Sequence, residues 1–369
     1  MATLFRVVAL ATLVHAATAA DWLPAESPAI LWTGRTKAVA GRGIAFDWEG
    51  VSASFVVNGK GAWVTLIANV TLDADCAGRI SVFVNGFHTA NMVLHAEFST
   101  YLLVAGLEQQ VHNVTVSYTM EPGNSCASRG PGRDVAFVGF STSGTFVTEP
   151  SQPLAHRIDI IGDSITAGSQ YDPEHAVPII CNDWLVTNSV TYNWESYLCR
   201  EFAANCTIVA WSGKGLVNNG GCAAGANMST LYTQTEGGDS QTMWDFERAS
   251  RPDAVIVYLG TNDFSCGKTT DAIFMVGLMY FVNNTIASYS RSSGATSTTF
   301  FLALGPMSPT RPLAAITAAV AQLQAAGVKA LPLNMTSGVL DGCGGHPGAL
   351  GHRQMALQAV PQIRVAMGW

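Results

Sequence analysis

Strand-like and helical segments alternate along the second half of the chain, and this alternation constrains its fold more than any other feature. The strand-like runs are residues 157–161, 207–211, 254–259, 298–304 and 328–333. The helical stretches are near residues 194–204, 271–289, 313–326 and 350–367. Such alternation predicts a mostly parallel sheet with helices on both of its faces. We therefore expect a three-layer α/β/α domain built on five strands.

The first half of the chain has the period of β-strands. Apolar and polar residues alternate in short runs, as at residues 52–57, 62–68, 80–84, 100–104 and 113–118. Turn sequences separate these runs, and a helical period is nowhere sustained between residues 28 and 147. This pattern predicts a β-sandwich of the jelly-roll-like kind.

The length of the chain also indicates two domains. A chain of 369 residues exceeds what one hydrophobic core usually holds. Pro150 and Pro153 mark a short linker where the periodicity changes. We therefore expect a β-sandwich domain at residues 21–148 and the α/β domain at residues 149–369.

The first twenty residues are typical of an exported protein. Arg6 is followed by an apolar run over residues 7–14 and then by small residues up to Ala20. This is the pattern of a secretory signal peptide, and the apolar run is too short to cross a bilayer. We expect residues 1–20 to be removed, and the mature protein to be secreted and extracellular.

All eight cysteines follow the predicted signal peptide. An even number of cysteines in an exported chain predicts disulfides, and no pair has the CxxC spacing typical of zinc or thioredoxin sites. A bond between Cys199 and Cys206 would link the end of a helix to the next strand. Six N-x-S/T sequons predict glycosylation in a eukaryotic host, at Asn69, Asn113, Asn205, Asn227, Asn283 and Asn334.

The charge balance excludes several classes of partner. The formal net charge is -7, only 12% of the residues are charged, and the sequence has no basic cluster. Nucleic acids and anionic membrane surfaces are bound through basic patches, so we expect neither as a partner. An uncharged polymer suits this composition better, and we expect the protein to be a monomer.

A serine stands where a strand of the predicted parallel sheet ends. The segment Ile158-Asp159-Ile160-Ile161-Gly162-Asp163-Ser164 runs from the strand into a loop. Ligands of such sheets bind at the carboxyl ends of the strands, so Ser164 is expected at the crevice. A serine becomes a nucleophile only when a base removes its proton. Taken alone, Ser164 is better explained as a helix N-cap.

Two further loops at the same edge can stabilise a negative charge. Gly213 lies in a glycine-containing loop after the second strand, where backbone N–H groups can turn toward an anion. Asn262, in Gly260-Thr261-Asn262-Asp263, brings an amide to the end of the third strand. Neutral donors of this kind stabilise the oxyanion of acyl transfer. Each residue, taken alone, is also a common turn residue.

A histidine near the C-terminus can serve as the base. His346 lies in a glycine-rich loop before the last predicted helix. Imidazole titrates near neutrality, so it can take the serine proton and return it to a leaving alcohol. His352 competes for this role, but it falls at or inside the helix, where packing explains it better.

Four blocks in this order, GDSIT, the SGKG loop, GTND and the late His-Pro, resemble those of the SGNH hydrolase superfamily. The β-rich domain, WSGKGLVNN and the GC-x-x-HP ending resemble carbohydrate esterase family 2, which includes acetyl xylan esterases. The resemblance implies Ser164 as nucleophile and His346 as base. It also implies an oxyanion hole made by the N–H groups of Ser164 and Gly213 and the side chain of Asn262. Asp163 would order the loop.

The acid of the catalytic triad departs from the superfamily pattern. That pattern has Asp three residues before the histidine, where this chain has Cys343. Either Asp341 reaches back to orient His346, or it is only a turn residue. In the second case the site resembles the Ser-His dyads of some family 2 members, in which a backbone carbonyl orients the imidazole. Either kind of partner can set the tautomer of the ring.

The motifs and the resemblance together predict a serine esterase that removes small acyl groups, above all acetyl, from cell-wall polysaccharide such as xylan or glucomannan. Trp211 and Trp184 are candidates for stacking against a sugar ring, although core packing explains any one tryptophan better. The mechanism needs no cofactor and no metal, and we expect none. Two alternatives stay open: a lipid or small-ester hydrolase on the same fold, and a catalytically inert carbohydrate-binding protein.

Overall fold

The computed structural model describes residues 21–59, 64–70, 78–95, 97–122, 135–149, 154–169, 188–294, 297–308 and 310–369. The predicted signal peptide and Trp184 lie outside the described residues.

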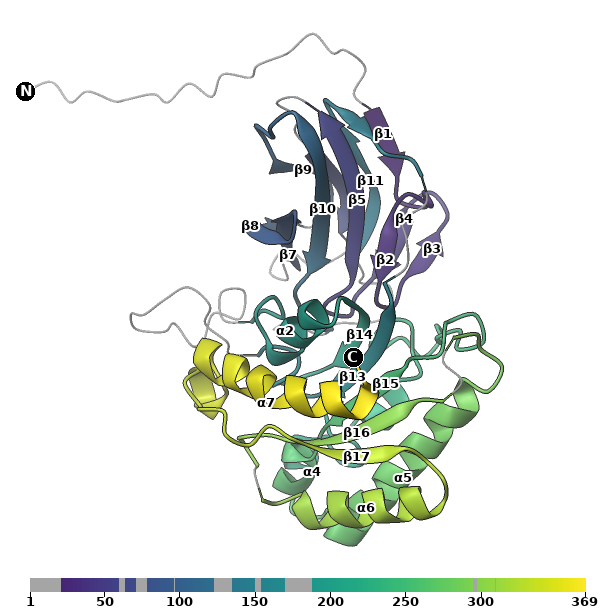
Figure 1. Cartoon of the computed structure of the whole chain (residues 1–369), viewed down its shortest axis with the longest axis vertical. Coiled ribbons are helices and arrows are strands. Elements are labelled where there is room, and N and C mark those ends of the chain that lie inside the picture. Colours follow the sequence, from purple (N-terminus) through teal and green to yellow (C-terminus); the bar gives the residue numbers. More distant parts are fainter. Residues whose placement is uncertain are drawn as a thin grey trace, which may run out of the picture.

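Within the described part of the N-terminal half, the chain forms two antiparallel six-stranded sheets (Figure 1). One sheet contains β1 (Asp21–Pro24), β3 (Lys37–Val39), β4 (Gly43–Phe46), β6 (Val64–Val70), β9 (Glu97–Val104) and β11 (Val135–Thr142). The other contains β2 (Leu31–Thr33), β5 (Ser52–Gly59), β7 (Gly78–Val84), β8 (Phe87–Leu94), β10 (Gln110–Tyr118) and β12 (Thr145–Phe146). The predicted β-sandwich is confirmed.

The alternation read from the sequence places a core between these two sheets. In β5, Ala53, Phe55 and Val57 are buried, and Ser54 between them is more exposed. The ring centroid of Phe55 lies 4.3 Å from that of Phe140 in β11 on the other sheet. Burial of one such apolar side chain contributes about 1.5–3 kcal/mol, so a strand with this period is stable only with its apolar face covered.

The C-terminal half contains a parallel sheet that has five strands among the described residues, in the order β14-β13-β15-β16-β17. The strands are β13 (His156–Gly162), β14 (Ala204–Ala210), β15 (Ala254–Tyr258), β16 (Thr299–Leu304) and β17 (Ala330–Asn334). The helices are α2 (Trp194–Glu201), α3 (Met228–Leu231), α4 (Thr261–Ser265), α5 (Asp271–Ser288), α6 (Leu313–Ala325) and α7 (Ala349–Met367). Short 3₁₀ turns occur at η1 (Gly220–Cys222) and η2 (Cys343–Gly345). The α/β fold and its five strands are as predicted.

Both faces of this sheet are covered by helices, which explains the continuous apolar character of its strands. In β15 every residue is buried. Val255 and Val257 pack in the cluster that includes α5 and α6, whereas Ala254 and Ile256 pack in the cluster that includes α2 and α7. Successive side chains of a strand point to opposite faces, so β15 contributes to both layers.

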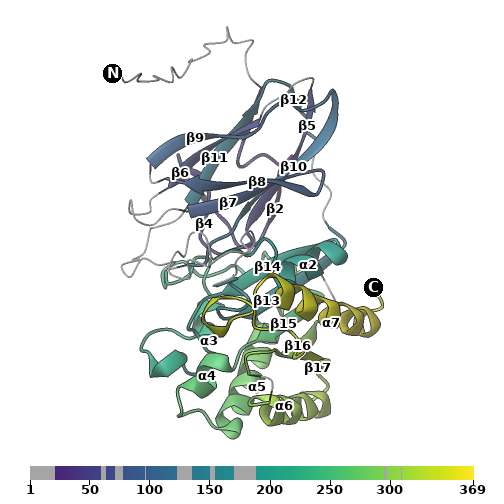
Figure 2. The ribbon, with the colours of Figure 1, turned by 90° about the vertical axis from the view of Figure 1, so that its left-hand side faces the viewer.

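The sandwich stands on the α/β domain next to β13 and β14, whereas β16 and β17 lie farther from it (Figure 2). The predicted bond between Cys199 and Cys206 is present and joins α2 to β14, with the two Cα atoms 6.2 Å apart. It ties the helix to the edge strand that lies nearest the sandwich.

Candidate active site

Three neighbouring strands end at the same level and carry the predicted site residues into one region. Gly162, the last residue of β13, pairs with Ala210 of β14 on one side and with Tyr258 of β15 on the other. The loops that follow these strands begin with Asp163, Trp211 and Leu259. Because parallel strands present their carboxyl ends at one edge, the loops of the three motifs are brought together there.

Ser164 lies in a tight turn directly after β13. A Cβ atom at Gly162 would come within 2.1 Å of the Thr166 hydroxyl oxygen, so only glycine allows the chain to turn here. Ser164 is 9% exposed, and its Oγ lies 2.8 Å from Nε2 of His346. The turn therefore holds the Ser164 hydroxyl within hydrogen-bond distance of the His346 imidazole.

His346 reaches Ser164 from the loop between β17 and α7. Its backbone carbonyl accepts from Gly342 N–H at 2.9 Å, and its N–H donates to Cys343 O at 3.0 Å. Burial lowers the pKa of His346 from its ordinary value, and the carbonyls of Cys343 and Gly344 offset part of this effect. The neutral imidazole is therefore favoured, which is the form that can accept a proton from serine.

Apart from Ser164, the polar groups near the His346 ring are backbone carbonyls and not a carboxylate. Nδ1 of His346 is buried and makes no hydrogen bond of regular geometry to a described residue. The carbonyls of Cys343 and Gly344 are the groups that favour its protonated form. Of the two alternatives that the sequence left open, this environment favours the dyad, in which a backbone carbonyl orients the ring.

Asp341 accepts hydrogen bonds from backbone N–H groups at the start of α7. One of its carboxylate oxygens accepts from Gly348 N–H at 2.7 Å and from Gly351 N–H at 3.0 Å. The other accepts from Leu350 N–H at 3.1 Å. These groups are among the backbone donors left open at a helix N-terminus, so the position of Asp341 is that of a helix cap. The structure does not bring its carboxylate to His346.

The loops with the predicted oxyanion donors Gly213 and Asn262 follow the two strands that adjoin β13, but the donors are not equally available. The N–H groups of Ser164 and Gly213 have no acceptor among the described residues. Gly213 has a φ of +77°, and a Cβ atom there would meet nothing within 4 Å. The amide nitrogen of Asn262 donates to Asp163 Oδ2 at 3.3 Å and to Lys214 O at 3.0 Å. Donation from Asn262 to an oxyanion therefore requires one of these partners to be exchanged.

Asp163 is buried beside Ser164 and orders its turn. One oxygen accepts from Ile165 N–H at 3.1 Å, and the other accepts from Asn262. Burial raises the pKa of Asp163 to about 7. The carboxyl group thus links the serine turn to the loop that carries Asn262, in line with the ordering role implied by the sequence.

Asp263 is a structural residue of the site for which the sequence indicated no role. Its carboxylate accepts from the backbone N–H groups of Leu216, Val217 and Asn218 at 2.7 to 3.0 Å. It thereby holds the loop that contains Gly213. No local pattern in the sequence could indicate this role, because the three N–H groups lie 45 to 47 residues from Asp263 in the chain.

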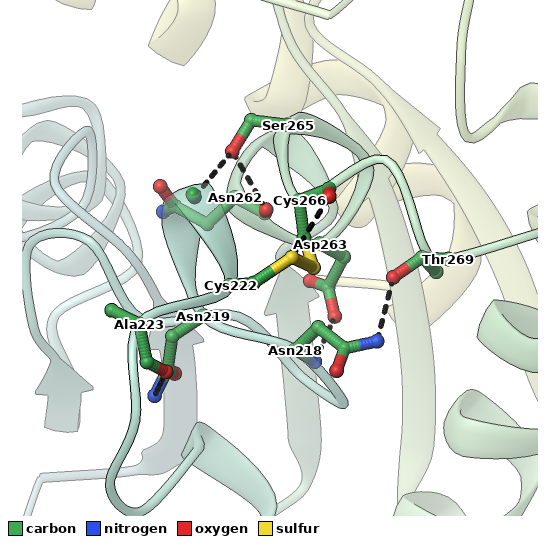
Figure 3. Close-up of a disulfide and its surroundings, with 10 residues drawn as sticks. Asn218, Asn219, Cys222, Ala223, Asn262, Asp263, Ser265, Cys266 and Thr269 are labelled. Atoms are coloured by element: carbon green, nitrogen blue, oxygen red, sulfur yellow. Dashed lines mark hydrogen bonds between the residues drawn. A yellow bond between two sulfur atoms is a disulfide. The ribbon is translucent and has the colours of Figure 1, made fainter.

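A disulfide ties the same two loops together (Figure 3). Cys222 at the end of η1 is bonded to Cys266 directly after α4, and their Cα atoms lie 4.6 Å apart. Figure 3 shows Asn262 and Asp263 beside this bond. The sequence predicted disulfides but not this pairing.

The tryptophans predicted as sugar-stacking candidates differ in position. Trp211 is half-buried at the start of the loop that contains Gly213, edge-to-face with Trp48 of the sandwich at a centroid distance of 6.5 Å. The ammonium group of Lys214 lies 5.0 Å from the Trp211 ring centroid. Trp184 lies outside the described residues.

His352, the competing histidine, is fully buried in α7, where its Nδ1 accepts from Trp194 N–H at 3.4 Å. Burial lowers its pKa to about 3, so it stays neutral and packs in the core. In the part of the chain that the structure covers, no group of three or more His, Cys, Asp or Glu side chains could hold a metal ion. Over the same residues, no helix combines the length and the apolar character needed to cross a bilayer.

Family models match both parts of the chain. The GDSL-like Lipase/Acylhydrolase family matches residues 160–354, which is more than half of the chain. Carbohydrate esterase 2 N-terminal matches residues 32–147. The first match contains the loops of all four predicted motifs, and the second covers most of the sandwich.

Two curated relatives match this chain over different shares of their own length. The chain is 28% identical over 284 residues to the Cellulase/esterase CelE of Acetivibrio thermocellus, which is 76% of this chain and 32% of CelE. It is 24% identical over 352 residues to an Acetylxylan esterase / glucomannan deacetylase of Cellvibrio japonicus, which is 94% of this chain and 91% of that enzyme. The chain thus spans about a third of CelE and nearly all of the Cellvibrio enzyme.

Solved structures share the whole architecture. A family two carbohydrate esterase from Cellvibrio japonicus matches with a TM-score of 0.78 at 22% identity, over 95% of this chain and 98% of that one. A family two carbohydrate esterase from Clostridium thermocellum in complex with cellohexaose matches with a TM-score of 0.77 at 24% identity, over 92% and 99%. These likenesses concern the fold. The match over residues 160–354 establishes that this chain belongs to the GDSL-like lipase/acylhydrolase family, and residues 32–147 match the N-terminal domain of carbohydrate esterase family 2.

Proposed function

We propose that this protein is a secreted serine esterase that removes acetyl groups from a cell-wall polysaccharide such as xylan or glucomannan. The observation that carries the proposal is the 2.8 Å distance between Ser164 Oγ and His346 Nε2. Ser164 and Gly213 lie in the loops that follow the adjoining strands β13 and β14, which supports a site where a hydroxyl, an imidazole and amide donors face one region. These are the parts that acyl transfer needs.

In the proposed first step, Ser164 Oγ attacks the acetyl carbonyl carbon while His346 Nε2 accepts the hydroxyl proton. The carbonyl oxygen becomes an oxyanion, which the N–H groups of Ser164 and Gly213 and the amide of Asn262 stabilise. The intermediate collapses when the bond to the sugar oxygen breaks and His346 returns the proton to that oxygen. A free sugar hydroxyl and an acetylated serine result.

In the second step, His346 takes a proton from water, and the resulting hydroxide attacks the acetyl-serine. The same donors stabilise the second oxyanion. The bond to Ser164 Oγ breaks, the serine regains its proton from His346, and acetic acid leaves and ionises to acetate in solution. The lowered pKa of His346 supports this cycle, because the imidazole starts each half as a neutral base.

The choice of substrate is supported by the relatives. The Cellvibrio relative is named for acetylxylan and glucomannan, and the Clostridium structure is a complex with cellohexaose. The half-buried ring of Trp211 beside the oxyanion loop suits stacking against a sugar. We extend the proposal to export through residues 1–20, to a domain division at residue 149, and to a monomer; the two disulfides among the described residues fit an oxidising compartment.

The test is acetate release from acetylated xylan, acetylated glucomannan and an aryl acetate. Ser164→Ala should lower kcat by at least about 10³-fold, because the nucleophile is lost. Ser169→Ala is the matched control, since Ser169 lies in the same loop and only its backbone bonds to Ser164. Equal rates for Ser164→Ala and the parent would refute the assignment.

A series of aryl esters from acetate to octanoate separates the first alternative. The proposed enzyme prefers acetate, whereas a lipid esterase prefers the longer chains. Binding to the polysaccharides without any ester hydrolysis by the parent would instead identify a carbohydrate-binding protein.

A further inference from the structure

A carboxylate of the β-sandwich domain reaches the loop that carries Gly213. Glu121 follows β10 and is 3% exposed. Its Oε2 accepts from the backbone N–H of Ser212 at 2.5 Å. Ser212 directly precedes Gly213, so one domain bonds to the oxyanion loop of the other. The pKa of Asp163 in the serine turn is raised mainly by burial, and the charge of Glu121 adds to this effect.

A second contact from the sandwich supports the same loop. Trp48 is fully buried, and its ring lies edge-to-face against Trp211, the residue before Ser212, with an interplanar angle of 81°. Edge-to-face aromatic pairs are favourable beyond the area that they bury. The residue pair at the start of the loop is therefore held by two groups from the other domain, one through its ring and one through its backbone.

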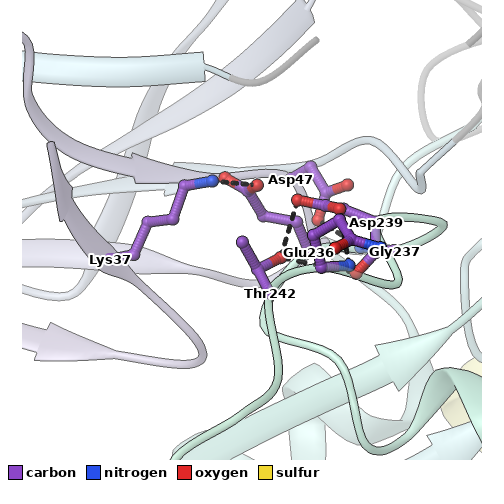
Figure 4. Close-up of polar contacts among 7 residues, drawn as sticks. Lys37, Asp47, Glu236, Gly237, Asp239 and Thr242 are labelled. Carbon is purple, nitrogen blue, oxygen red and sulfur yellow. Dashed lines mark hydrogen bonds and ion pairs between the residues drawn. The ribbon is translucent and has the colours of Figure 1, made fainter. Parts of the chain in front are cut away.

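The sandwich is itself anchored to the α/β domain close by. Lys37 forms an ion pair with Glu236, and Asp47 accepts from Gly237 N–H at 2.9 Å (Figure 4). Arg35 is fully buried and donates to Gln234 O at 2.7 Å. These contacts join sandwich strands and loops to residues 234–237, so the position of Glu121 relative to Ser212 is set by a packed interface.

The α/β domain holds the loop on both sides of Gly213, because Trp211 N–H donates to Gly162 O at 3.4 Å and Lys214 O accepts from the Asn262 amide at 3.0 Å. Asp263 binds the N–H groups of residues 216 to 218, after Gly213. The glycine has no Cβ to pack, and the space around that position is open to 4 Å. The direction of the Gly213 N–H thus depends on anchors on both sides, with Asp263 after the glycine and Glu121 before it.

We propose that Glu121 is a positioning residue for the oxyanion hole, through which the sandwich domain contributes to catalysis without touching substrate. This inference rests on the proposed function, because it assigns Gly213 N–H to the oxyanion. Loss of the Glu121 acceptor leaves Ser212 N–H free to turn and the loop free to shift. Displacement of a catalytic donor by about 1 Å can lower a rate by about 100-fold.

The test compares Glu121→Ala, Glu121→Gln and Glu121→Asp in the full chain, with Glu26→Ala as the matched control because Glu26 is exposed on the same domain. Each is assayed on an aryl acetate well below its Tm. We expect Glu121→Ala to lower kcat by about 10- to 100-fold with little change in KM. Glu121→Gln should recover much of the rate, because its amide oxygen can accept from Ser212.

A transition-state readout separates positioning from general stability. A boronic acid that forms a tetrahedral adduct with Ser164 should bind Glu121→Ala more weakly by about the same factor as the loss in kcat. A folded Glu121→Ala with the parent kcat and the parent boronate affinity would overturn the inference. If that variant does not fold, Glu121→Asp decides, since it keeps the charge and withdraws the acceptor by one methylene; the parent kcat in Glu121→Asp would also overturn it.

The result also distinguishes the inference from the proposed function. If the parent hydrolyses the ester and Ser164→Ala does not, the proposed function stands, whatever the result for the Glu121 variants. A parent without activity removes both, because no oxyanion hole is then in use.

Discussion

The hydrogen bonds of Asp341 bear directly on whether it acts as a triad acid or as a helix cap. It stands close to His346 in sequence, as a triad acid would, yet its carboxylate caps the start of α7. The imidazole instead has backbone carbonyls as neighbours. A carbonyl can fix the tautomer of a histidine, although it stabilises the imidazolium less than a carboxylate does.

We predict that Asp341→Ala lowers stability and leaves catalysis nearly unchanged. The free energy of unfolding should fall by about 0.5–2 kcal/mol, because three backbone donors of α7 lose their acceptor. The kcat should stay within about twofold, whereas loss of a true triad acid lowers kcat by about 10⁴-fold. Urea unfolding and aryl acetate kinetics measure the two effects. Asp341→Asn, which keeps one acceptor oxygen, should lie between the parent and the alanine variant in stability.

At the scale of elements, the site is a set of loops held by cross-links. The loop after β14 and the helix α4 after β15 carry the proposed oxyanion donors Gly213 and Asn262, and the Cys222–Cys266 disulfide joins the two segments. Asp263 in α4 adds three hydrogen bonds to the same loop. The regular sheet positions the strand ends, and these links position the loops beyond them.

The two disulfides that join described residues provide a matched pair of variants. Cys222→Ser/Cys266→Ser should lower stability by about 2–4 kcal/mol, because the bond closes a segment of 44 residues. It should also lower kcat, since Gly213 and Asn262 lose their shared tether. Cys199→Ser/Cys206→Ser removes a bond at the edge strand and should lower stability alone. Equal losses of kcat in the two double variants would contradict this division, and thermal unfolding with kinetics on both decides it.

At the scale of the whole molecule, the two domains meet around buried carboxylates. Glu49 of the sandwich and Glu195 of α2 are both fully buried. Burial raises the pKa of each well above 4.5; nearby Glu121 and Asp47 raise that of Glu49 further, and Arg200 offsets part of the effect at Glu195. In the folded protein these groups therefore keep their protons to a higher pH than in the unfolded chain.

This difference predicts a loss of stability as the pH rises. Above pH 4.5 the unfolded chain releases protons that the folded state retains, so unfolding becomes easier until the folded-state pKa is passed. Each group contributes up to about 1.4 kcal/mol per pH unit over that window. Glu195→Gln and Glu49→Gln should each flatten the dependence of Tm on pH between 5 and 8. Glu26→Gln, at an exposed position, should leave it unchanged; parallel curves for all variants would show that the buried carboxyls do not titrate in this way.

Periodicity and local motifs predicted much of this protein from sequence. The helix expected at residues 271–289 is Asp271–Ser288, and the strand expected at 254–259 is Ala254–Tyr258. Such elements follow from the spacing of apolar residues, which is a local property. Ser164 and His346 were indicated because each lies in a local motif rich in turn residues. Parallel strands also bring their carboxyl ends to one edge of the sheet, where such motifs meet.

Only the tertiary structure decided how the candidate site is supported. It placed Asp341 on a helix terminus, paired Cys222 with Cys266, and brought Glu121 to Ser212, 91 residues away in the chain. Hydrogen bonds and disulfides of this kind depend on where two distant segments come to lie, and the packing of the two domains sets that position. A single sequence shows the chemical type of each residue. The partner that each residue meets depends on how distant segments pack, which the sequence pattern does not show.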